Sequence, residues 1–489
     1  MKQVVRNLLG LCAGILMLVQ TWGIRAAENG APIQTIKLVA VGDIMMHKEE
    51  IEGGKVPGTN TYNFDYMFKH IKPYIENADL AIGNLETPLA GKERGYTGYP
   101  AFNAPEQLAI ALKNTGFDVL TTANNHSLDR HYQGVAHTLK VLDEVGLAHT
   151  GTARTKEEQD KVLIQEVKGI KIAFMAYTYG TNGIRPDKDK DKDKDKEYCV
   201  NYLNKEKMLR DIDLAKQQGV DIICVSLHFG NEYERQQNKA QEEWVKFLFD
   251  NGVDIVLGSH PHVLQPMELK NGKFVIYSLG NFVSAQRTRY RDSSILLNLT
   301  LTKNFETGET FIDYAEYVPI WTDLSRIDGR PHFRVLPAEE ALSNYRSGQD
   351  SYLSTQDYNK LMTSLADTKS MYKHTPLISK AIKIDGYIDQ YLSLEEGGIT
   401  LVEARKLGQA LGMEVKWDAR TMQMLLIKDG RKLTVLPGSR YIYEGDKFIC
   451  LEATTRIIEG KVFIPLRGLS EYIGKKVEYT TTKPWINIY

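Results

Sequence analysis

Between about residues 37 and 284, short apolar runs alternate with segments whose apolar residues recur every three or four positions. Such runs predict buried strands, and the three- and four-residue spacing predicts amphipathic helices. The predicted strands are Ile36–Val41, Ala78–Ile82, Asp118–Thr122, Asp221–Leu227, Asp254–Leu257 and Lys273–Leu279. The predicted helices are Pro105–Thr115, Val135–Val145, Glu206–Gln218 and Ala240–Asp250. This alternation indicates an α/β domain whose strands are mostly covered on both faces.

The pattern changes after residue 284. Two further apolar runs, Ser294–Leu301 and Phe311–Val318, predict strands that complete the domain by about residue 320. Residues 337–390 are polar with helical spacing, and we expect them to pack on the main domain or to bridge to the next one. Several predicted helices end at a glycine, which supplies the left-handed conformation of a helix C-cap: Gly116, Gly146, Gly219 and Gly252.

The tail of the chain repeats itself at an offset of 62 residues, because Glu403–Trp417 matches Pro465–Tyr479. Each copy predicts a short helix, a glycine cap and then strands. The matched pairs are Arg405 with Arg467, Leu407 with Leu469, Gly412 with Gly474, and Val415 with Val477. The tail resembles the small repeat domain at the N-terminus of some copper amine oxidases, which is also attached to many exported proteins. Because residues 392–489 contain no histidine, we expect a structural stalk without copper, and binding to the wall or to a partner is the alternative.

The first 27 residues have the pattern of an export signal. Lys2 and Arg6 are followed by an apolar run to Val19 and then by the small residues Ala26 and Ala27. Arg25 makes a poor cleavage site, so an uncleaved membrane anchor is the alternative. No other segment of the sequence reaches membrane-spanning length. From the signal pattern we predict an exported protein that is extracellular or associated with the cell envelope.

Composition and charge exclude several classes of protein. Of 489 residues, 42% are hydrophobic, which excludes wholesale disorder. The 61 Lys and Arg residues nearly balance 62 Asp and Glu, so no basic excess indicates nucleic acid as a partner. Four scattered cysteines are too few for a disulfide scaffold or a cysteine zinc site. The dipeptide Asp-Lys occurs five times between Asp187 and Lys196, which predicts a solvated loop, with cation binding as the alternative.

Polar residues gather where the predicted strands end. The clusters are Asp43 with His47, Asn84 with Glu86, Asn125 and His126 with Asp129, then His228, His260 with His262, and Asn281. Since the carboxyl ends of strands in α/β sheets lie at one edge, we expect these side chains to converge. A single histidine at a strand end is usually structural, but so many clusters together indicate a site. Oxygen and nitrogen ligands without cysteine suit Mn²⁺, Zn²⁺ or Fe²⁺ better than an all-oxygen Ca²⁺ site.

The order of these clusters resembles the CapA-type poly-γ-glutamate capsule synthesis family over about residues 36–284. The segments from His228 to Tyr233 and from Tyr277 to Phe282 belong to the same resemblance. That family is itself similar to calcineurin-like metallophosphoesterases. The resemblance implies an α/β (α+β) fold, a four-layer metallophosphoesterase-like β-sandwich flanked by helices, with a small C-terminal α+β repeat domain. The domains that we predict are a signal at 1–27, a CapA-like domain at 36–320, a helical connector at 321–391 and the repeat domain at 392–489.

The resemblance also implies a cofactor of two divalent metal ions, of which Mn, Zn and Fe are the candidates. Glu86 is expected to bridge the two ions. The ligands implied for the first ion are Asp43 and His262, and those for the second are Asn125, His228 and His260. Two such ions can activate a bridging water and stabilise an in-line displacement.

Further residues are expected to act on the substrate. By the same resemblance, His126 would contact the leaving group or the scissile phosphate and donate a proton. Asp129 lies close enough in the sequence to orient His126. Residues 91–99 form a glycine-rich loop after Glu86 whose basic side chains could meet an anion, with an ordinary surface loop as the alternative; residues 179–183 could add to the rim. The side chains expected to bind the substrate are Lys92, Arg94 and Asn281.

The sequence departs from the superfamily pattern at three positions. The usual histidine two residues after Asp43 is absent, and His47 is an alternative ligand in its place. Glu86 replaces the usual bridging aspartate, and His131 replaces a glycine after the Asn-His-x-x-Asp motif. These departures question hydrolysis more than they question metal binding.

We therefore predict an exported, metal-dependent, phosphoesterase-like hydrolase of the cell envelope. The resemblance implies a role in the synthesis or attachment of a poly-γ-glutamate capsule. The expected partner is an anionic envelope polymer or a phosphoester substrate, together with membrane-bound synthase subunits or the cell wall. The alternative is a non-catalytic scaffold that binds the polymer within a membrane-bound synthase and export complex.

Overall fold

The structure, a computed structural model, describes residues 33–186, 196–372, 376–458, 460–479 and 485–489. The predicted export signal and residues 187–195 of the Asp-Lys repeat lie outside the described residues. Among the helices of the described part, none has both the length and the apolar character needed to cross a membrane.

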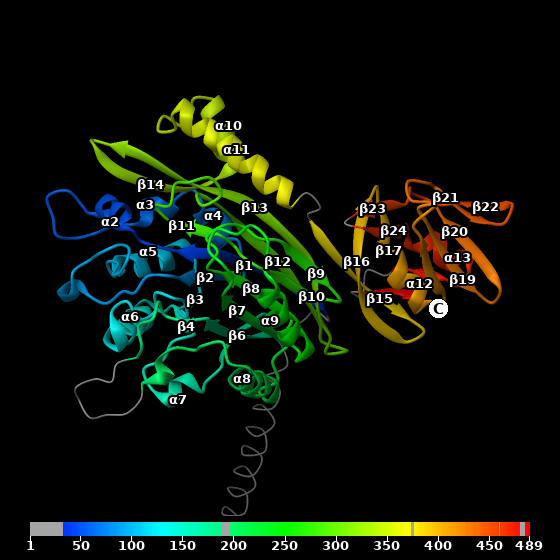
Figure 1. Ribbon diagram of the computed structural model, residues 1–489, viewed down its shortest axis with the longest axis horizontal. Helices are drawn as coiled ribbons and strands as arrows, with labels where there is room; N and C mark the ends of the chain where they lie inside the picture. Colours follow the sequence, from blue (N-terminus) through cyan, green and yellow to red (C-terminus); the bar gives the residue numbers. More distant parts are fainter. Residues whose placement is uncertain (1–32, 187–195, 373–375, 459, 480–484) are drawn as a thin grey trace, which may run out of the picture.

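Two β-sheets pack face to face at the centre of the main body (Figure 1). One edge of the larger sheet holds four parallel strands, β1 (Ile33–Ile44), β2 (Leu80–Leu85), β3 (Val119–Thr121) and β4 (Ala148–Thr150). The smaller sheet has the order β5 (Leu163–Val167), β6 (Ile170–Thr178), β7 (Ile222–His228), β8 (Ile255–Ser259), β10 (Lys273–Ile276) and β9 (Met267–Lys270). Apolar side chains of both sheets, such as Leu38 and Phe174, fill the space between them. All six strands predicted between residues 36 and 279 are confirmed.

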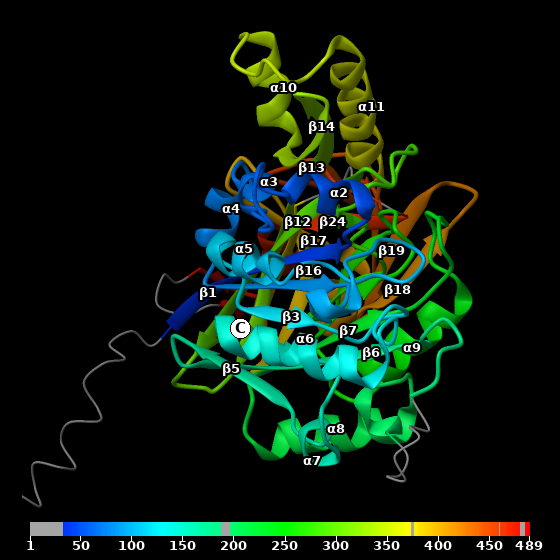
Figure 2. The same ribbon diagram turned by 90° about the vertical axis from the view of Figure 1, so that its left-hand side faces the viewer.

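Helices cover the outer face of each sheet. On the larger sheet lie α5 (Gln107–Thr115) and α6 (His131–Val145), which are in front of the strands in Figure 2. On the smaller sheet lie α8 (Lys205–Gln217) and α9 (Lys239–Asp250). Shorter helices lie in the connections: α2 (Lys48–Gly54), α3 (Asp65–Phe68), α4 (Lys72–Glu76) and α7 (Lys156–Gln159). The result is four layers, helices, sheet, sheet and helices, which confirms the predicted fold class.

Two long antiparallel strands extend the larger sheet beyond β1. They are β12 (Ser293–Asn304) and β13 (Thr310–Ile327), and β14 (Arg330–Pro337) pairs with the far end of β13. The helical hairpin of α10 (Ala338–Arg346) and α11 (Thr355–Met371) packs on them around Trp321, and it stands above the sheets in Figure 1.

The prediction that residues 321–391 are a helical connector is wrong for much of that segment. Helices occupy only α10 and α11, whereas the end of β13, all of β14, β15 (Leu377–Ile384) and the start of β16 (Tyr387–Glu396) are strands. These strands are partly solvent-facing, so polar residues interrupt their apolar pattern and conceal the alternation. The ranges of the four domains stay predictions.

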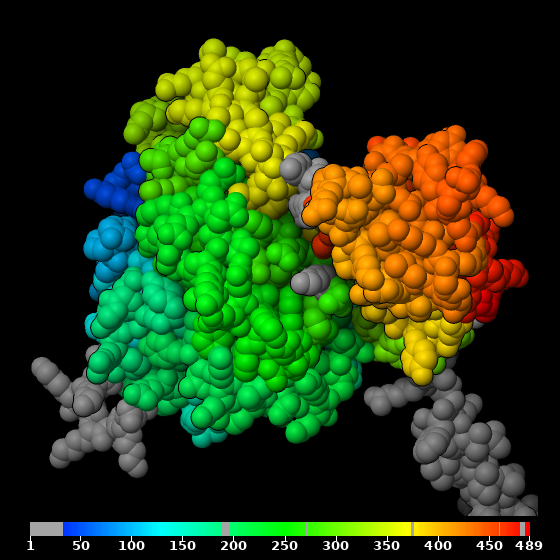
Figure 3. Space-filling model, turned by 45° about the vertical axis from the view of Figure 1, so that its right-hand side comes forward, coloured from blue at the N-terminus to red at the C-terminus, as the bar shows by residue number. Residues whose placement is uncertain are grey.

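The C-terminal part has its own apolar core and forms a lobe beside the main body (Figure 3). The larger sheet continues into it, where β13 pairs with β15 at Tyr314 with Ile378 and at Ala315 with Leu377. Its outer strands are β17 (Ile399–Glu403), β24 (Lys461–Pro465), β23 (Arg456–Ile458), β25 (Val477–Glu478) and β26 (Trp485–Ile488). A separate sheet holds β18 (Glu414–Asp418), β19 (Gln423–Lys428), β20 (Arg431–Val435), β21 (Tyr441–Glu444) and β22 (Lys447–Cys450).

The internal repeat of this lobe is visible in the structure. Strand β17 leads into α12 (Ala404–Ala410), and strand β24 leads into α13 (Leu466–Tyr472), so both elements recur at the offset of 62 residues. The glycines that follow, Gly412 and Gly474, have φ angles of 76° and 87°. That conformation favours glycine and ends each helix as the sequence predicts.

Candidate metal centre

The predicted clusters lie at the carboxyl ends of strands from both sheets. Asp43 is the next-to-last residue of β1, and Glu86 directly follows β2. His228 is the last residue of β7, and His260 directly follows β8. Because these ends meet where the two sheets face each other, residues far apart in sequence become neighbours.

Two glycines allow the strand ends to approach this closely. A Cβ atom at Gly42 would lie 1.9 Å from the carbonyl oxygen of Gly280. A Cβ atom at Gly258 would lie 1.9 Å from the carbonyl oxygen of Tyr277. The Asp43 N–H donates to the Gly280 carbonyl at 2.9 Å, and Asp43 pairs in register with Asn281 of β11 (Asn281–Val283). Only glycine leaves room for these contacts.

The structure brings together two groups of buried ligand atoms that share one carboxylate. Asp43, Glu86 and His228 form one group, and Glu86, His260 and His262 form the other; within each group the ligand atoms lie within 4.8 Å of one another. The Nε2 atom of His228 is 3.4 Å from Glu86 Oε1, and His262 Nε2 is 3.9 Å from the same oxygen. Asp43 belongs with His262 as well, because its Oδ2 atom lies 3.2 Å from His262 Nδ1. The assignment of ligands to a first and a second ion stays a prediction.

Three buried polar atoms of this cluster have no hydrogen-bond partner in the described part of the chain. No N–H or hydroxyl group of the described residues donates to either carboxylate oxygen of Glu86, and His260 Nδ1 also lacks a hydrogen-bond partner. Burial and the neighbouring Asp43 raise the pKa of Glu86 well above its usual value. Burial and the adjacent histidines lower the pKa of His228 well below its usual value, and that of His260 to about 4. Burying a carboxylate without a partner costs free energy of folding, and a bound cation would offset that cost. Neutral imidazole nitrogens are also good metal ligands, so this donor set fits a divalent cation.

Neighbouring polar groups hold the ligands in place. Asn84 Nδ2 donates to Asp43 Oδ1 at 2.8 Å. The hydroxyl of Ser259 lies 2.9 Å from His228 Nδ1, and Asn281 Oδ1 lies 3.0 Å from His262 Nδ1. Such contacts fix the ring orientation and tautomer of a metal-binding histidine. The roles of Asn84 and Ser259 are missing from the sequence analysis, although both lie inside its motifs.

The segment after β3 supplies the predicted catalytic residues. Asn125 Oδ1 lies 2.8 Å from His228 Nε2, which places Asn125 at the cluster. His126 Nδ1 lies 2.8 Å from Asp129 Oδ2, and both side chains are buried. The same Asp129 oxygen accepts a hydrogen bond from the Phe102 N–H at 2.7 Å. At the end of this segment His131 has φ 54°, so it keeps the left-handed conformation that favours glycine.

Besides Asn125, His126, Asp129 and Asn281, three further predicted site residues lie outside these two groups. The Nδ1 atom of His47 lies 3.8 Å from Glu50 Oε1, and the His47 ring meets Phe102 edge to face. Lys92 and Arg94 are exposed on the short 3₁₀ helix η1 (Lys92–Arg94), where Arg94 donates to Gln133. From the same loop it is Tyr99 whose ring reaches His126, at 6.5 Å between centroids. The roles predicted for His47, Lys92 and Arg94 stay predictions.

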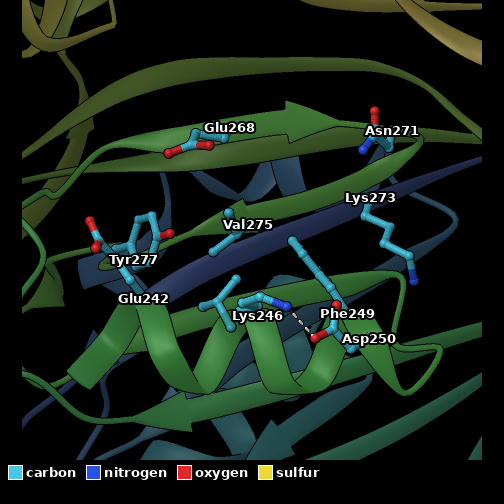
Figure 4. A pocket seen from close by; sticks show the side chains of 10 residues that line it. Glu242, Lys246, Phe249, Asp250, Glu268, Asn271, Lys273, Val275 and Tyr277 are labelled. Atoms are coloured by element: carbon cyan, nitrogen blue, oxygen red, sulfur yellow. Dashed lines mark hydrogen bonds and ion pairs between the residues drawn. The ribbon is translucent and has the colours of Figure 1, made fainter. Parts of the chain in front are cut away.

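A cavity of about 540 Å³ lies elsewhere, between α9 and strands β9 and β10 (Figure 4). Its lining includes Phe249 and Tyr277 together with the ion pair of Lys246 and Asp250. None of the lining residues belongs to the two groups of candidate ligands. The candidate chemistry of the protein therefore lies at the strand ends and not in this cavity.

Comparison with known proteins agrees with this architecture. Residues 37–286 match the family described as "Bacterial capsule synthesis protein PGA_cap", and this match spans more than half of the chain. The chain belongs to this family. Residues 387–488 match the family described as "Copper amine oxidase N-terminal domain", which agrees with the resemblance of the repeated tail.

Two curated relatives in the capsule synthesis family are similar over more than half of the chain. One is the capsule biosynthesis protein CapA of Bacillus anthracis, 31% identical over 298 residues, which are 58% of this chain and 69% of the relative. The other is the PGA biosynthesis protein CapA of Bacillus subtilis, 30% identical over 293 residues, 58% of this chain and 73% of the relative.

Among solved structures, the calcineurin-like phosphoesterase YfkN from Bacillus subtilis is similar in fold. It has a TM-score of 0.35 and 14% identity, and the match covers 69% of this chain and 99% of that chain. That score is too low to support an inference about the site. The chain is thus a CapA-type capsule biosynthesis protein whose main body has a four-layer fold.

Proposed function

We propose that this protein is an exported, metal-dependent hydrolase that cleaves an ester during synthesis or attachment of an anionic capsule polymer. The observation that carries the proposal is Glu86, a buried carboxylate without a hydrogen-bond donor that lies between two groups of ligand atoms. Membership in the capsule synthesis family supports the polymer, and the name of one relative, a PGA biosynthesis protein, favours poly-γ-glutamate.

The donor set would hold two divalent ions, with Mn²⁺, Zn²⁺ and Fe²⁺ as candidates. Glu86 would contact both ions, and the remaining ligands would be Asp43, Asn125, His228, His260 and His262. Bound there, the ions would supply a water of lowered pKa and positive charge for the developing oxyanion. Asn84, Ser259 and Asn281 keep the ligands oriented.

His126 is the proposed proton donor. Its Nδ1 atom is held by the Asp129 carboxylate at 2.8 Å, so Nε2 is the nitrogen left to hold a proton for the leaving group. The Phe102 N–H fixes the Asp129 oxygen that receives Nδ1, and the Phe102 ring packs against the imidazole at 4.7 Å between centroids. This arrangement orients His126 before a substrate binds.

The location and the partners belong to the same proposal. The N-terminal pattern of Lys2, Arg6 and the apolar run supports export, and the capsule relatives support a place in the cell envelope. The C-terminal lobe, which has no histidine, would act as a stalk that holds the metal centre near a membrane-bound synthase or the wall.

The test combines elemental analysis with activity on the purified protein. We expect about two divalent ions per chain and metal-dependent hydrolysis of a generic phosphodiester. His126→Ala should keep the metal and lose about 10²- to 10⁴-fold in turnover. His149→Ala removes another histidine that pairs with a carboxylate, Asp143 at 3.0 Å, and should leave turnover unchanged. A protein that binds metal and supports capsule formation equally well with His126→Ala is the scaffold, not the hydrolase.

A further inference from the structure

Three exposed tyrosines surround the metal centre. Tyr99 is 72% exposed and lies 6.5 Å from the His126 ring, whereas Tyr179 is 48% exposed and lies 4.7 Å from the His260 ring. Tyr233 is 42% exposed, and its ring lies 6.2 Å from the His262 ring. Each tyrosine comes from a different connection, so the fold assembles a rim of aromatic faces at the mouth of the site.

The guanidinium of an arginine stacks on the ring of one of these tyrosines. The guanidinium carbon of Arg291 lies 3.3 Å from the centroid of the Tyr233 ring. The backbone carbonyl of Arg291 accepts a hydrogen bond from Asn281 Nδ2 at 2.9 Å, and Asn281 Oδ1 lies 3.0 Å from His262 Nδ1. Arg291 is therefore tied to the ligand shell through a single side chain.

The charge of Arg291 is not neutralised within the described part of the chain. Its neighbours in the same loop are paired, since Arg289 lies 2.7 Å from Asp367 and Arg287 lies 3.9 Å from Asp292. No carboxylate among the described residues forms an ion pair with Arg291. A guanidinium stacked on an aromatic ring keeps its N–H groups free at its edge, where they can bind a carboxylate or a phosphate through two parallel hydrogen bonds.

We propose that Tyr233 and Arg291 form a subsite for a second anionic group of the substrate, while a first group lies at the metal centre. This inference rests on the proposed function, and it narrows the substrate to a chain that bears two or more anionic groups. The ring holds the guanidinium in one orientation, which reduces the entropy lost on binding. The exposed faces of Tyr99 and Tyr179 would contact the uncharged part of the chain between the charges.

The test measures binding to the full-length, metal-loaded protein, so it does not depend on turnover. The probes are a short γ-linked glutamate oligomer, inorganic tripolyphosphate and inorganic phosphate as the single anion. Arg291→Met should weaken binding of at least one of the two longer probes by about 10- to 100-fold, since a charge-assisted hydrogen bond contributes about 1.5–3 kcal/mol. Phosphate binding should change by less than about twofold. The probe that responds more strongly tells a carboxylate chain from a phosphate chain.

Two further variants keep the test decisive. Tyr233→Leu removes the ring and keeps the charge, and it should weaken the responding probe by about 3- to 10-fold. Arg346→Met removes an arginine that donates to the hydroxyl of Tyr358 on the helical hairpin, and it should leave every affinity unchanged.

Several outcomes would overturn the subsite. They are unchanged affinity for both longer probes in Arg291→Met, an equal loss for all three probes, and no binding of either longer probe to the unmodified protein. The proposed function fails separately. If the protein binds the oligomer through Arg291 but hydrolyses no phosphodiester, the subsite stands and the hydrolase does not.

Discussion

One carboxylate oxygen of Asp129 orients the imidazole of His126, the proposed proton donor. Asp129 Oδ2 meets both His126 Nδ1 and the Phe102 N–H. Asp129→Asn keeps the size of the side chain but removes the negative charge and can present an N–H to His126, which favours the wrong tautomer. We expect turnover to fall by about 10²- to 10⁴-fold, with little change in KM and none in metal content.

Steady-state kinetics beside elemental analysis would check this prediction. Asp143→Asn is the control, because Asp143 also pairs with a histidine, His149, but on the surface. If Asp129→Asn lost metal in proportion to its activity, the carboxylate would be supporting the fold of the centre and not orienting the imidazole.

The sequence indicates the candidate ligands of the centre more directly than it indicates the residues around them. Asp43, Glu86 and His260 are predictable because they stand at the ends of apolar runs, and parallel strands end at one edge. Arg291 and Tyr233 lie 58 positions apart in two loops, and they become neighbours only in the folded protein, where Asn281 donates to the Arg291 carbonyl. No local pattern encodes that contact, and within residues 91–99 the charge pattern points to Lys92 and Arg94 and not to Tyr99.

At the scale of elements, strand β13 carries a bulge with a partly buried carboxyl group. Thr300 pairs with Tyr314 and Leu301 with Ile312, so Asp313 is the extra residue on β13. Burial raises the pKa of Asp313 to about 6, although a hydrogen bond from Thr302 opposes the shift. Because the folded protein holds this proton more tightly than the unfolded chain, the carboxyl destabilises the fold increasingly as pH rises from about 4 to 6.

Asp313→Asn should therefore stabilise the protein at pH 7 by about 1–3 kcal/mol and give no gain near pH 3.5. The free energy of unfolding from urea titrations at both pH values would measure this. Asp328→Asn, in the exposed turn between β13 and β14, should change neither value. A gain from Asp313→Asn that is equal at both pH values would show that the ionisation of Asp313 is not its cause.

The strands of the protein differ in how well the sequence predicts them. Strands β7 and β8 are almost entirely buried and begin with apolar runs, so they are easily recognised. In β14 and β15 only some positions are buried, and charged residues such as Arg334 and Lys380 interrupt the run. Arg334 pairs with the buried Asp323 on β13, a contact between two strands that neither strand reveals alone.

At the scale of the whole molecule, the main body and the C-terminal lobe have separate apolar cores. They meet at the residue pairs between β13 and β15, at the small cluster of Phe311, Ala381 and Trp485, and where Leu377 and Leu392 pack against the core between the sheets. Because each part buries apolar side chains in a core of its own, one core can unfold while the other stays folded. We expect calorimetry to resolve two transitions, one for the main body and one for the lobe.

Removal of the metal should move only one of these transitions. The candidate ligands all lie in the main body, and the described part of the lobe contributes none of them. An ion present at about 100 times its Kd would stabilise the body by about 2.7 kcal/mol, which is roughly 3–5 °C in Tm for a unit of this size. A chelator should therefore lower the Tm of the main body by that amount and leave the Tm of the lobe unchanged. Glu86→Gln, which replaces the carboxylate shared by both groups with a weaker ligand, should make the Tm of the main body insensitive to the chelator. If both transitions moved together, the two cores would be one cooperative unit, and the lobe would contribute to the stability of the metal centre instead of only carrying it.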